Sequence, residues 1–404
     1  MESWNRLIRE KQKVRTKELK DRKGTDQHLV RESNRVLVLN YIRERGTVSR
    51  SDLAPYTGLS RTAIGNIVDD LIREGIVLQE EHRVGDDRRT NLLSFNATAA
   101  YVLGGTLGSR HLSIVLADLS GQPRQHLKVP FSLNKGPEEG LPLLSKLLKV
   151  FVAQQQVAWD MIVGLGLGIV RPLASFPQKT PLPTPLARWT NVDIQQALTD
   201  ELGIPVYLDH DGNMGALGES RYGAGRNEDN IIYLNVGSTI SGGLLLNHDI
   251  YRGYAGIAGE IGHIPVDLNG HLCQCGRSGC LETIASKSGI LQEVQRFFPS
   301  LTTLPQVIEA AQNGNVTCAG ALERAGRYLG VALASLINLL NPSLIVLDGS
   351  VIQAGELVMR ALRTSAENHS LPASFAHTRI TPAECNGLAM SLGSIATILD
   401  AIFL

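Results

Sequence analysis

Three of the five cysteines lie within eight residues of one another, as Cys273, Cys275 and Cys280, and His263 precedes them by ten residues. Four thiolate and imidazole groups are what a closed tetrahedral zinc site requires. Two glycines between the second and third cysteines let the backbone turn sharply enough for the thiolates to converge. No acidic group placed to activate water sits between the ligands as it does in a helical HExxH site. The pattern predicts one structural zinc ion per chain; the alternative is a set of unlinked buried thiols.

The composition indicates a water-soluble protein with two or three domains. The chain has 404 residues, of which 43% are hydrophobic and 19% charged, as in globular proteins with a large core. No apolar run reaches the roughly 18 residues needed to span a bilayer. The charged first segment lacks the apolar stretch of a signal peptide, and the cysteine usage favours a reducing compartment. We therefore expect a cytoplasmic protein without membrane insertion.

The charge is unevenly distributed, although the formal net charge is zero. Residues 1–96 carry 19 Lys+Arg against 15 Asp+Glu, and the remainder is correspondingly acidic. A basic end on a neutral protein is typical of a polyanion partner at that end. A solvated basic tail without a partner gives the same pattern.

Residues 49–75 have the pattern of a helix-turn-helix. Ser49 is a good N-cap with Asp52 three residues later, and Gly58 can end the short helix in a left-handed conformation. Ser60 then caps a second helix. Its apolar stripe has spacings of three and four and consists of Ile64, Ile67, Val68, Leu71 and Ile72.

Two stretches carry a family resemblance. The run 259–263, GEIGH, followed by CQCGRSGCLE, resembles the ROK family of bacterial sugar kinases and sugar-responsive repressors. The run SRSDLAPYTGLSRTAIGNIVDDLIREGIV resembles the winged helix of ROK and related regulators. Strands at 76–81 and 91–95 around GDDRR would form the wing.

The resemblance implies a DNA-binding surface on the second helix and the wing. Ser60, Arg61, Thr62 and Asn66 open this helix, and Arg and Asn can read guanine and adenine in the major groove. Other arginines are expected at phosphate or in the minor groove, namely Arg50, Arg88 and Arg89. A small helical domain for protein contacts is the alternative.

From Ala100 the chain mixes strands and helices over 300 residues, which favours an α/β architecture. The resemblance specifies the fold class: a winged helix-turn-helix followed by a two-lobed, actin-like ROK sugar-kinase-like domain of ribonuclease-H fold. We expect an arm at 1–30, the DNA-binding domain at 31–96 and the ROK domain at 97–404. The expected lobes are 97–212 with 386–404, and 213–385.

The glycine loops that hold ATP in the resembling kinases are altered at three places. Such loops need glycine because backbone N–H groups reach phosphate only where no side chain intervenes. In the first loop Thr106 replaces an aspartate and Ser109 a glycine, and in the second Thr239 and Ser241 replace glycines. Asp348 stands where a glycine would face nucleotide, and its charge repels polyphosphate. We therefore expect no ATP, no catalytic residue and no enzyme activity.

The sugar side of the resembling motifs is better kept. Asp211 matches the aspartate that acts as general base in the kinases, and His210 replaces a neighbouring asparagine. Glu260, His263 and Glu282 match the remaining polar contacts, and carboxylates accept from paired hydroxyls. His263 would bind zinc through one ring nitrogen and donate from the other. A relic pocket that holds ordered water is the alternative.

Arg171 departs from the family pattern, because a glycine close to the sugar is usual there. Its side chain could narrow the pocket or bind an anionic group of the ligand. A solvated surface arginine fits the sequence equally well.

These features together predict a sequence-specific DNA-binding transcriptional regulator of carbohydrate metabolism, a repressor controlled by a sugar or sugar derivative. A homodimer or homotetramer would bind a palindromic double-stranded operator, because twofold symmetry spaces two recognition helices by a DNA turn. One alternative is an ATP-dependent sugar kinase with an appended DNA-binding domain; another is a carboxy-terminal domain that binds a protein. The sugar, the operator, the sign of regulation and the role of residues 1–30 stay open.

Overall fold

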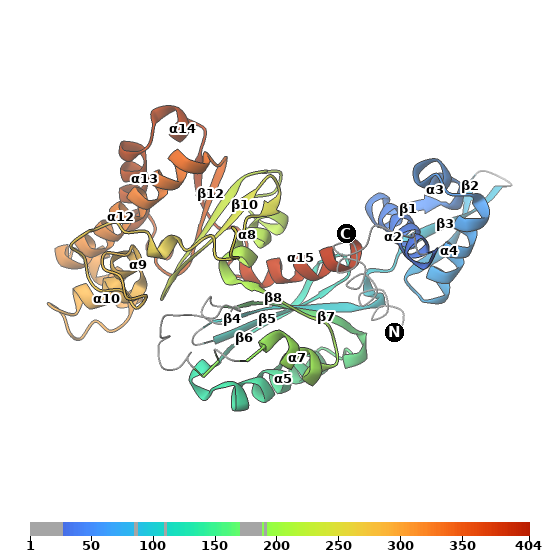
Figure 1. Cartoon of the computed structure of the whole chain (residues 1–404), viewed down its shortest axis with the longest axis horizontal. Coiled ribbons are helices and arrows are strands. Elements are labelled where there is room, and N and C mark those ends of the chain that lie inside the picture. Colours follow the sequence, from blue (N-terminus) through green and yellow to red (C-terminus); the bar gives the residue numbers. More distant parts are fainter. Residues whose placement is uncertain (1–26, 85–87, 109–110, 170–187, 190–191) are drawn as a thin grey trace.

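The computed structural model describes residues 27–84, 88–108, 111–169, 188–189 and 192–404. Three parts follow one another (Figure 1): a small domain of helices and strands at one end, then two lobes that each contain a five-stranded sheet. Among the described helices, none is long and apolar enough to cross a membrane.

The first part is a winged helix-turn-helix. Its three strands pair antiparallel in the order β1-β3-β2. The expected caps are present: Ser49 and Asp52 form a reciprocal capping box, Gly58 has φ +68°, and Ser60 accepts from the Ala63 N–H. Its elements are α2 (Gln27–Arg45), β1 (Thr47–Ser49), α3 (Arg50–Thr57), α4 (Arg61–Arg73), β2 (Val77–Val84) and β3 (Arg88–Phe95).

The two lobes repeat one strand order, three antiparallel strands followed by two parallel ones. The first sheet has the order β6-β5-β4-β7-β8 and the second β11-β10-β9-β12-β13. The strands are β4 (Tyr101–Leu107), β5 (His111–Asp118), β6 (Pro123–Pro130), β7 (Ile162–Ile169) and β8 (Val206–His210), then β9 (Ile231–Val236), β10 (Ile240–Leu246), β11 (Asp249–Ile250), β12 (Leu344–Asp348) and β13 (Arg379–Pro382). This duplication confirms the predicted fold class.

Helices connect the strands and cover the sheets. Helix α12, the longest of the described helices, packs beside α13 in the second lobe. The helices are α5 (Pro137–Gln154), α7 (Ile194–Leu202), α8 (Asp211–Tyr222), α9 (Glu282–Ala285), α10 (Lys287–Val294), α11 (Leu304–Gln312), α12 (Val316–Leu340), α13 (Glu356–His369), α14 (Pro372–Ala376) and α15 (Ala389–Phe403).

In each lobe, the helix that follows the last strand of the sheet in sequence packs against the sheet of the other lobe. Helix α8 follows β8 of the first sheet but packs on β9 and β10, where a Cβ on Gly212 would lie 2.2 Å from the Gly242 carbonyl oxygen. Helix α15 follows β13 of the second sheet but packs on β4 and β7, where a Cβ on Gly104 would lie 2.2 Å from the Ser391 carbonyl oxygen. The two helices therefore cross between the lobes (Figure 1).

Glycines let α8 and α15 touch backbone to backbone. A Cβ on Gly218 would lie 1.8 Å from the Ala389 carbonyl oxygen, and one on Gly393 would lie 1.8 Å from that of Met214. Any larger residue at these two positions would push the helices apart.

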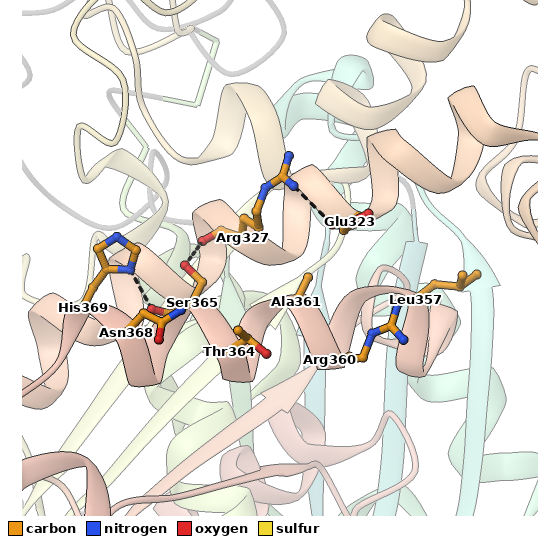
Figure 2. Close-up of a pocket in the computed structure, with 9 residues that line it drawn as sticks. All are labelled: Glu323, Arg327, Leu357, Arg360, Ala361, Thr364, Ser365, Asn368 and His369. Carbon is orange, nitrogen blue, oxygen red and sulfur yellow. Dashed lines mark hydrogen bonds and ion pairs between the residues drawn. The ribbon is translucent and has the colours of Figure 1, made fainter. Parts of the chain in front are cut away.

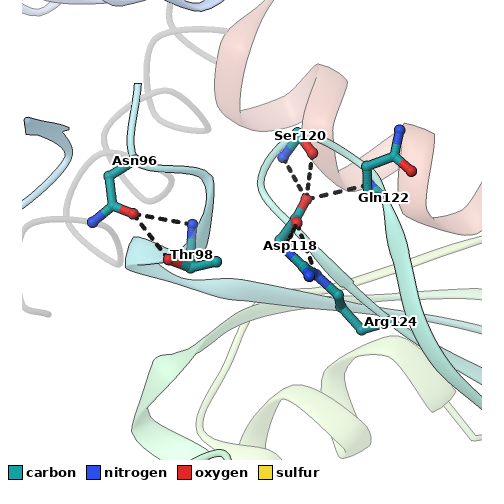
Figure 3. A network of polar contacts seen from close by, with 6 residues as sticks. All are labelled: Asn96, Thr98, Asp118, Ser120, Gln122 and Arg124. Atoms are coloured by element: carbon teal, nitrogen blue, oxygen red, sulfur yellow. Dashed lines mark hydrogen bonds and ion pairs between the residues drawn. The ribbon is translucent and has the colours of Figure 1, made fainter. Parts of the chain in front are cut away.

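The connection between the winged helix and the first lobe is held by short polar contacts (Figure 3). The Asn96 side chain donates to the Gly75 carbonyl at 2.8 Å and accepts from the Thr98 N–H and hydroxyl. One residue along, the Ala97 carbonyl accepts from the Leu119 N–H at 2.9 Å. Asp118 fixes the adjoining β5–β6 turn by accepting from Ser120 and Gln122.

The end of α15 forms a second joint to the winged helix. Phe403 is 1% exposed, and its carbonyl accepts from the Asn40 side chain at 2.7 Å. The Arg43 guanidinium lies 4.1 Å from the Phe403 ring centre, and the Phe95 ring meets it edge-on at 5.9 Å. One hydrophobic core therefore runs from the winged helix through α15 into both lobes.

Replacing Phe403 with alanine is expected to lower the free energy of unfolding by about 3 kcal/mol, because a buried aromatic ring leaves a cavity. The loss should appear in thermal unfolding and in faster proteolysis between the winged helix and the first lobe. Leu404→Ala is the matched control, since Leu404 is 74% exposed. Equal melting temperatures for the two variants would contradict the joint.

Candidate DNA-binding surface and ligand site

Helix α4 presents the predicted base-reading residues to solvent. Its buried stripe contains Ile64, Ile67, Val68 and Leu71, and the opposite side leaves the side chains of Arg61, Thr62 and Asn66 exposed. Ser60 is committed as the cap, with its hydroxyl 3.2 Å from the Ala63 nitrogen.

The other predicted DNA contacts have different settings. The Arg50 guanidinium already donates to Asp69 at 2.7 Å and to Gln79 at 3.0 Å, so contact with phosphate would require sharing it. The sequence placed Arg88 and Arg89 at the tip of a turn, but they lie in β3, paired with Val84 and Arg83. The hairpin ladder continues further toward the tip than the apolar pattern indicated.

Two ion pairs that the sequence reasoning missed hold α2 against α4. Arg31 donates to Asp70 at 2.8 Å, and Arg35 pairs with Glu74. Burial acts to lower the pKa of Arg35, but the carboxylates of Glu74, Glu32 and Asp70 together outweigh burial and the pKa is raised. The signal was available, because the basic pair on α2 and the acidic pair on α4 share a spacing of four.

His263, Cys273, Cys275 and Cys280 gather into one cluster, with one ligand atom from each lying within 4.8 Å of the others. The Cys273 sulfur lies 3.6 Å from His263 Nδ1, and the Cys275 and Cys280 sulfurs are 3.6 Å apart. Metal bonds of about 2.1–2.3 Å in a tetrahedron give ligand edges of roughly 3.6–3.8 Å. The donor set and its spacing therefore fit a metal ion.

The imidazole of His263 links this cluster to the predicted sugar site. While Nδ1 faces Cys273, Nε2 lies 3.9 Å from a Glu260 carboxylate oxygen. Burial raises the pKa of Cys280 to about 12 and also raises that of Cys273. Without a cation these thiols stay protonated, and a metal would have to displace their protons.

Asp211 and His210 lie buried at the start of α8. Their side chains are 8% and 6% exposed, and His210 Nε2 lies 3.2 Å from an Asp211 carboxylate oxygen. The same oxygen accepts from the Gly212 N–H at 2.8 Å. The carboxylate is thereby oriented at the N-terminal end of the helix that joins the lobes.

Glu282 lies half-buried at the start of α9, and one carboxylate oxygen accepts from the Ile240 N–H at 2.9 Å. Burial raises its pKa, the Glu260 charge acts in the same direction, and the Ile240 contact and His263 oppose the shift. Glu260 and His263 are therefore close enough to Glu282 for their charges to act on its pKa.

Glycine 242 brings the two halves of the predicted site together. A Cβ on Gly212 would strike the Gly242 carbonyl, and a Cβ on Gly242 would lie 3.0 Å from the Gly259 carbonyl oxygen. The α8 start that carries Asp211 is thus one backbone layer from the loop that carries Glu260. Arg171 lies outside the described residues.

Two of the positions that depart from the kinase nucleotide loops, Thr106 and Asp348, make side-chain contacts within the protein. Thr106 is buried, with its hydroxyl 3.3 Å from that of Ser391. The Asp348 carboxylate accepts from the Tyr233 hydroxyl at 2.9 Å and from the Gly349 N–H. Ser109 lies outside the described residues.

A separate groove of about 270 Å³ lies along α12 and α13 in the second lobe (Figure 2). Its polar lining includes Arg327, Arg360 and His369, and it contains none of the predicted ligand residues. The candidate sugar site therefore rests on residue geometry and not on this groove.

The fold and site together define a winged-helix protein with a sugar-kinase-like body. The ROK family model matches residues 102–400, and the chain belongs to the ROK family. It is 29% identical to the "Xylose repressor" of Bacillus subtilis over 93% of this chain and 97% of that protein. It is 26% identical to the "DNA-binding transcriptional dual regulator NagC" of Escherichia coli over 93% and 94%.

Solved structures share the fold. A ROK family transcriptional regulator, described as a homologue of the E. coli Mlc protein, has a TM-score of 0.74 and 23% identity over 93% of this chain and 98% of that one. A ROK hexokinase from Thermus thermophilus has a TM-score of 0.61 and 26% identity over 74% and 97%.

Gly212→Ala is expected to lower the free energy of unfolding by about 2 kcal/mol or more, because the new methyl group meets only backbone atoms. The control is Gly65→Ala in α4, where nothing lies within 4 Å and alanine should stabilise by up to about 1 kcal/mol. Chemical denaturation of both variants measures this difference. A Gly212→Ala protein as stable as Gly65→Ala would refute the close contact with β10.

Proposed function

We propose that the protein is a transcriptional repressor that binds an operator through its winged helix and responds to a sugar bound between its lobes. The observation that carries this proposal is the 97% coverage of the xylose repressor, because the similarity includes the winged helix as well as the ROK domain. The expected setting is the cytoplasm, and the expected regulated genes serve carbohydrate metabolism.

DNA recognition would fall to the exposed end of α4. Arg61, Thr62 and Asn66 would face base edges, and the arginines at 50, 88 and 89 would contact the backbone. A homodimer or homotetramer would present two such helices to a palindromic site.

The sugar would bind between Asp211 on α8 and the Glu260 loop, with His210 and Glu282 completing the polar set. Acidic oxygens accept from sugar hydroxyls. Movement of the lobe 97–212 with 386–404 against 213–385 would displace α8 and α15. Because α15 packs into the winged helix, its movement would shift the winged helix as well. The sugar would act by binding more tightly to an arrangement that has lower affinity for the operator.

The metal cluster would hold one structural zinc ion. Cys273, Cys275, Cys280 and Nδ1 of His263 would be its ligands, and the ion would orient the imidazole toward Glu260. Such an ion supplies a fixed loop and takes no part in chemistry.

A sugar kinase with an appended DNA-binding domain is the second candidate, supported by Asp211 at the position of the kinase base. Thr106 and Asp348 oppose it, because both fill space and hydrogen-bonding capacity where a nucleotide would need glycine or aspartate. Sugar phosphorylation that depends on ATP and is lost in Asp211→Asn would establish the kinase.

The repressor proposal predicts specific binding to genomic fragments that one sugar releases. Binding should be measured at fixed salt against neutral, amino and phosphorylated sugars, since phosphate contacts make affinity strongly salt-dependent. Arg61→Ala should weaken specific binding by about 1–3 kcal/mol. Arg327→Ala removes the same charge in the second lobe and should leave operator affinity unchanged. Asp211→Asn should bind DNA but fail to release it; no specific DNA binding would overturn the assignment.

Cys275→Ser and Cys280→Ser should each lose the zinc ion and the sugar response, because three ligands no longer fix the loop that carries His263. Elemental analysis should give one zinc per wild-type chain and none per variant. Cys318→Ser is the control, since Cys318 is a buried thiol outside the cluster. A normal sugar response from zinc-free variant protein would show that the ion is not needed.

A further inference from the structure

An ion pair joins the two lobes beside the candidate sugar site. Arg252 follows β11, an edge strand of the second sheet, and Asp209 lies in β8, an edge strand of the first sheet. The Arg252 Nε and Nη2 groups donate to one Asp209 carboxylate oxygen at 3.1 and 2.6 Å. The Asp209 side chain is 17% exposed, so the pair is partly shielded from solvent.

The other Asp209 oxygen organises the start of α8. It accepts from the His210 N–H at 2.6 Å and from the Asn213 side chain at 2.8 Å. Asp211 lies between these two donors in sequence. The carboxylate of Asp209 therefore connects Arg252 to the helical turn from which Asp211 projects.

The Arg252 end of the pair organises the loop that carries Glu260. The Arg252 guanidinium also donates to the Ile250 carbonyl at 3.3 Å, and the Arg252 carbonyl accepts from the Ala258 N–H at 3.0 Å. The segment 250–258 is closed on itself, and Gly259 and Glu260 follow it directly. One side chain thus fastens this loop to the opposite lobe.

We propose that Arg252 and Asp209 form an inter-lobe latch, in which Arg252 is a positioning residue that sets the spacing between Asp211 and Glu260 without touching the sugar. This inference rests on the proposed function where it concerns sugar affinity. The latch itself is a property of the sugar-free chain and is tested there separately.

The chain offers a matched control in Arg124 (Figure 3). Its Nε and Nη2 groups donate to one Asp118 oxygen at 3.0 and 2.6 Å, and Arg124 is 51% exposed against 53% for Arg252. The Arg124 pair lies within the β5–β6 hairpin of one lobe. Arg124→Ala therefore removes an equivalent ion pair without separating the lobes.

Hydrogen exchange of the sugar-free, full-length protein tests the latch. Arg252→Ala should speed amide exchange about tenfold both in 250–258 and in 210–214, because both ends lose the same partner. Arg124→Ala should leave these two segments unchanged. Unchanged exchange in Arg252→Ala, or equal changes in both variants, would overturn the latch even if no sugar binds.

Calorimetry with D-xylose, D-glucose and N-acetylglucosamine then tests the positioning role. A neutral sugar adds no charge, so weaker binding at 500 mM than at 50 mM NaCl should reflect screening of the pair. For the sugar that binds, Arg252→Ala should lose about tenfold in affinity and become insensitive to salt. Arg252→Lys should retain part of the sugar affinity and part of its dependence on salt.

A double variant separates positioning from direct contact. Asp209→Asn keeps an acceptor for His210 and Asn213 but removes the charge. Its loss of sugar affinity should equal that of Arg252→Ala. Combining the two should weaken binding no further, because both remove one interaction. Additive losses would mean that Arg252 contacts the sugar itself. If neither these sugars nor any of the panel used for operator release binds wild-type protein, the proposed sugar response fails, and the exchange result alone decides the latch.

Discussion

Close packing of α8 against α15 is the contact on which the two-lobed body depends. Helix α8 follows a strand of the first lobe and covers the sheet of the second, and α15 does the reverse. The contact between these two helices is therefore also a contact between the lobes. Gly218 and Gly393 remove the side chains that would keep the helices apart, and carbonyl oxygens fill that space. Because interiors are close-packed and transmit strain, a shift of α8 must carry α15 with it. A ligand that contacts the start of α8 therefore acts on an element shared by both lobes.

The candidate site also depends on glycines that allow close approach of backbone segments. Asp211, Glu260 and Glu282 come from three separate segments. Glycine at 212 and 242 lets the first two approach within one backbone layer, and the Ile240 N–H holds the Glu282 carboxylate. The cluster of His263 and three cysteines lies between Glu260 and Glu282 in sequence, and His263 faces sulfur on one side and a carboxylate on the other. Two residues that depart from the kinase nucleotide loops instead make internal contacts, Thr106 with Ser391 and Asp348 with Tyr233.

The sequence predicted what short-range patterns encode. The caps at Ser49 and Ser60 and the apolar stripe of α4 each depend on residues within one or two turns, and the spacing of Cys273, Cys275 and Cys280 made a cluster expected. Strand β6 was missed because its side chains are mostly exposed and give no apolar run. The packing of Phe403 against the winged helix and the pairing of Arg252 with Asp209 could not be predicted from the sequence. Each contact joins segments distant in the chain through a single side chain. The predicted roles of the DNA- and sugar-contacting residues stay predictions.

The joint at Phe403 also constrains the order in which the protein can be made. A chain synthesised from its amino terminus produces the winged helix first, and its local caps and short loops allow that domain to form early. Its contact with the rest of the molecule includes the ring and the carbonyl of Phe403, which lies 363 positions after Asn40. That contact forms only when α15 has been synthesised. During translation the DNA-binding domain therefore exists without its final orientation. The recognition helix therefore aligns with the body only after α15 has formed, and not when the winged helix itself folds.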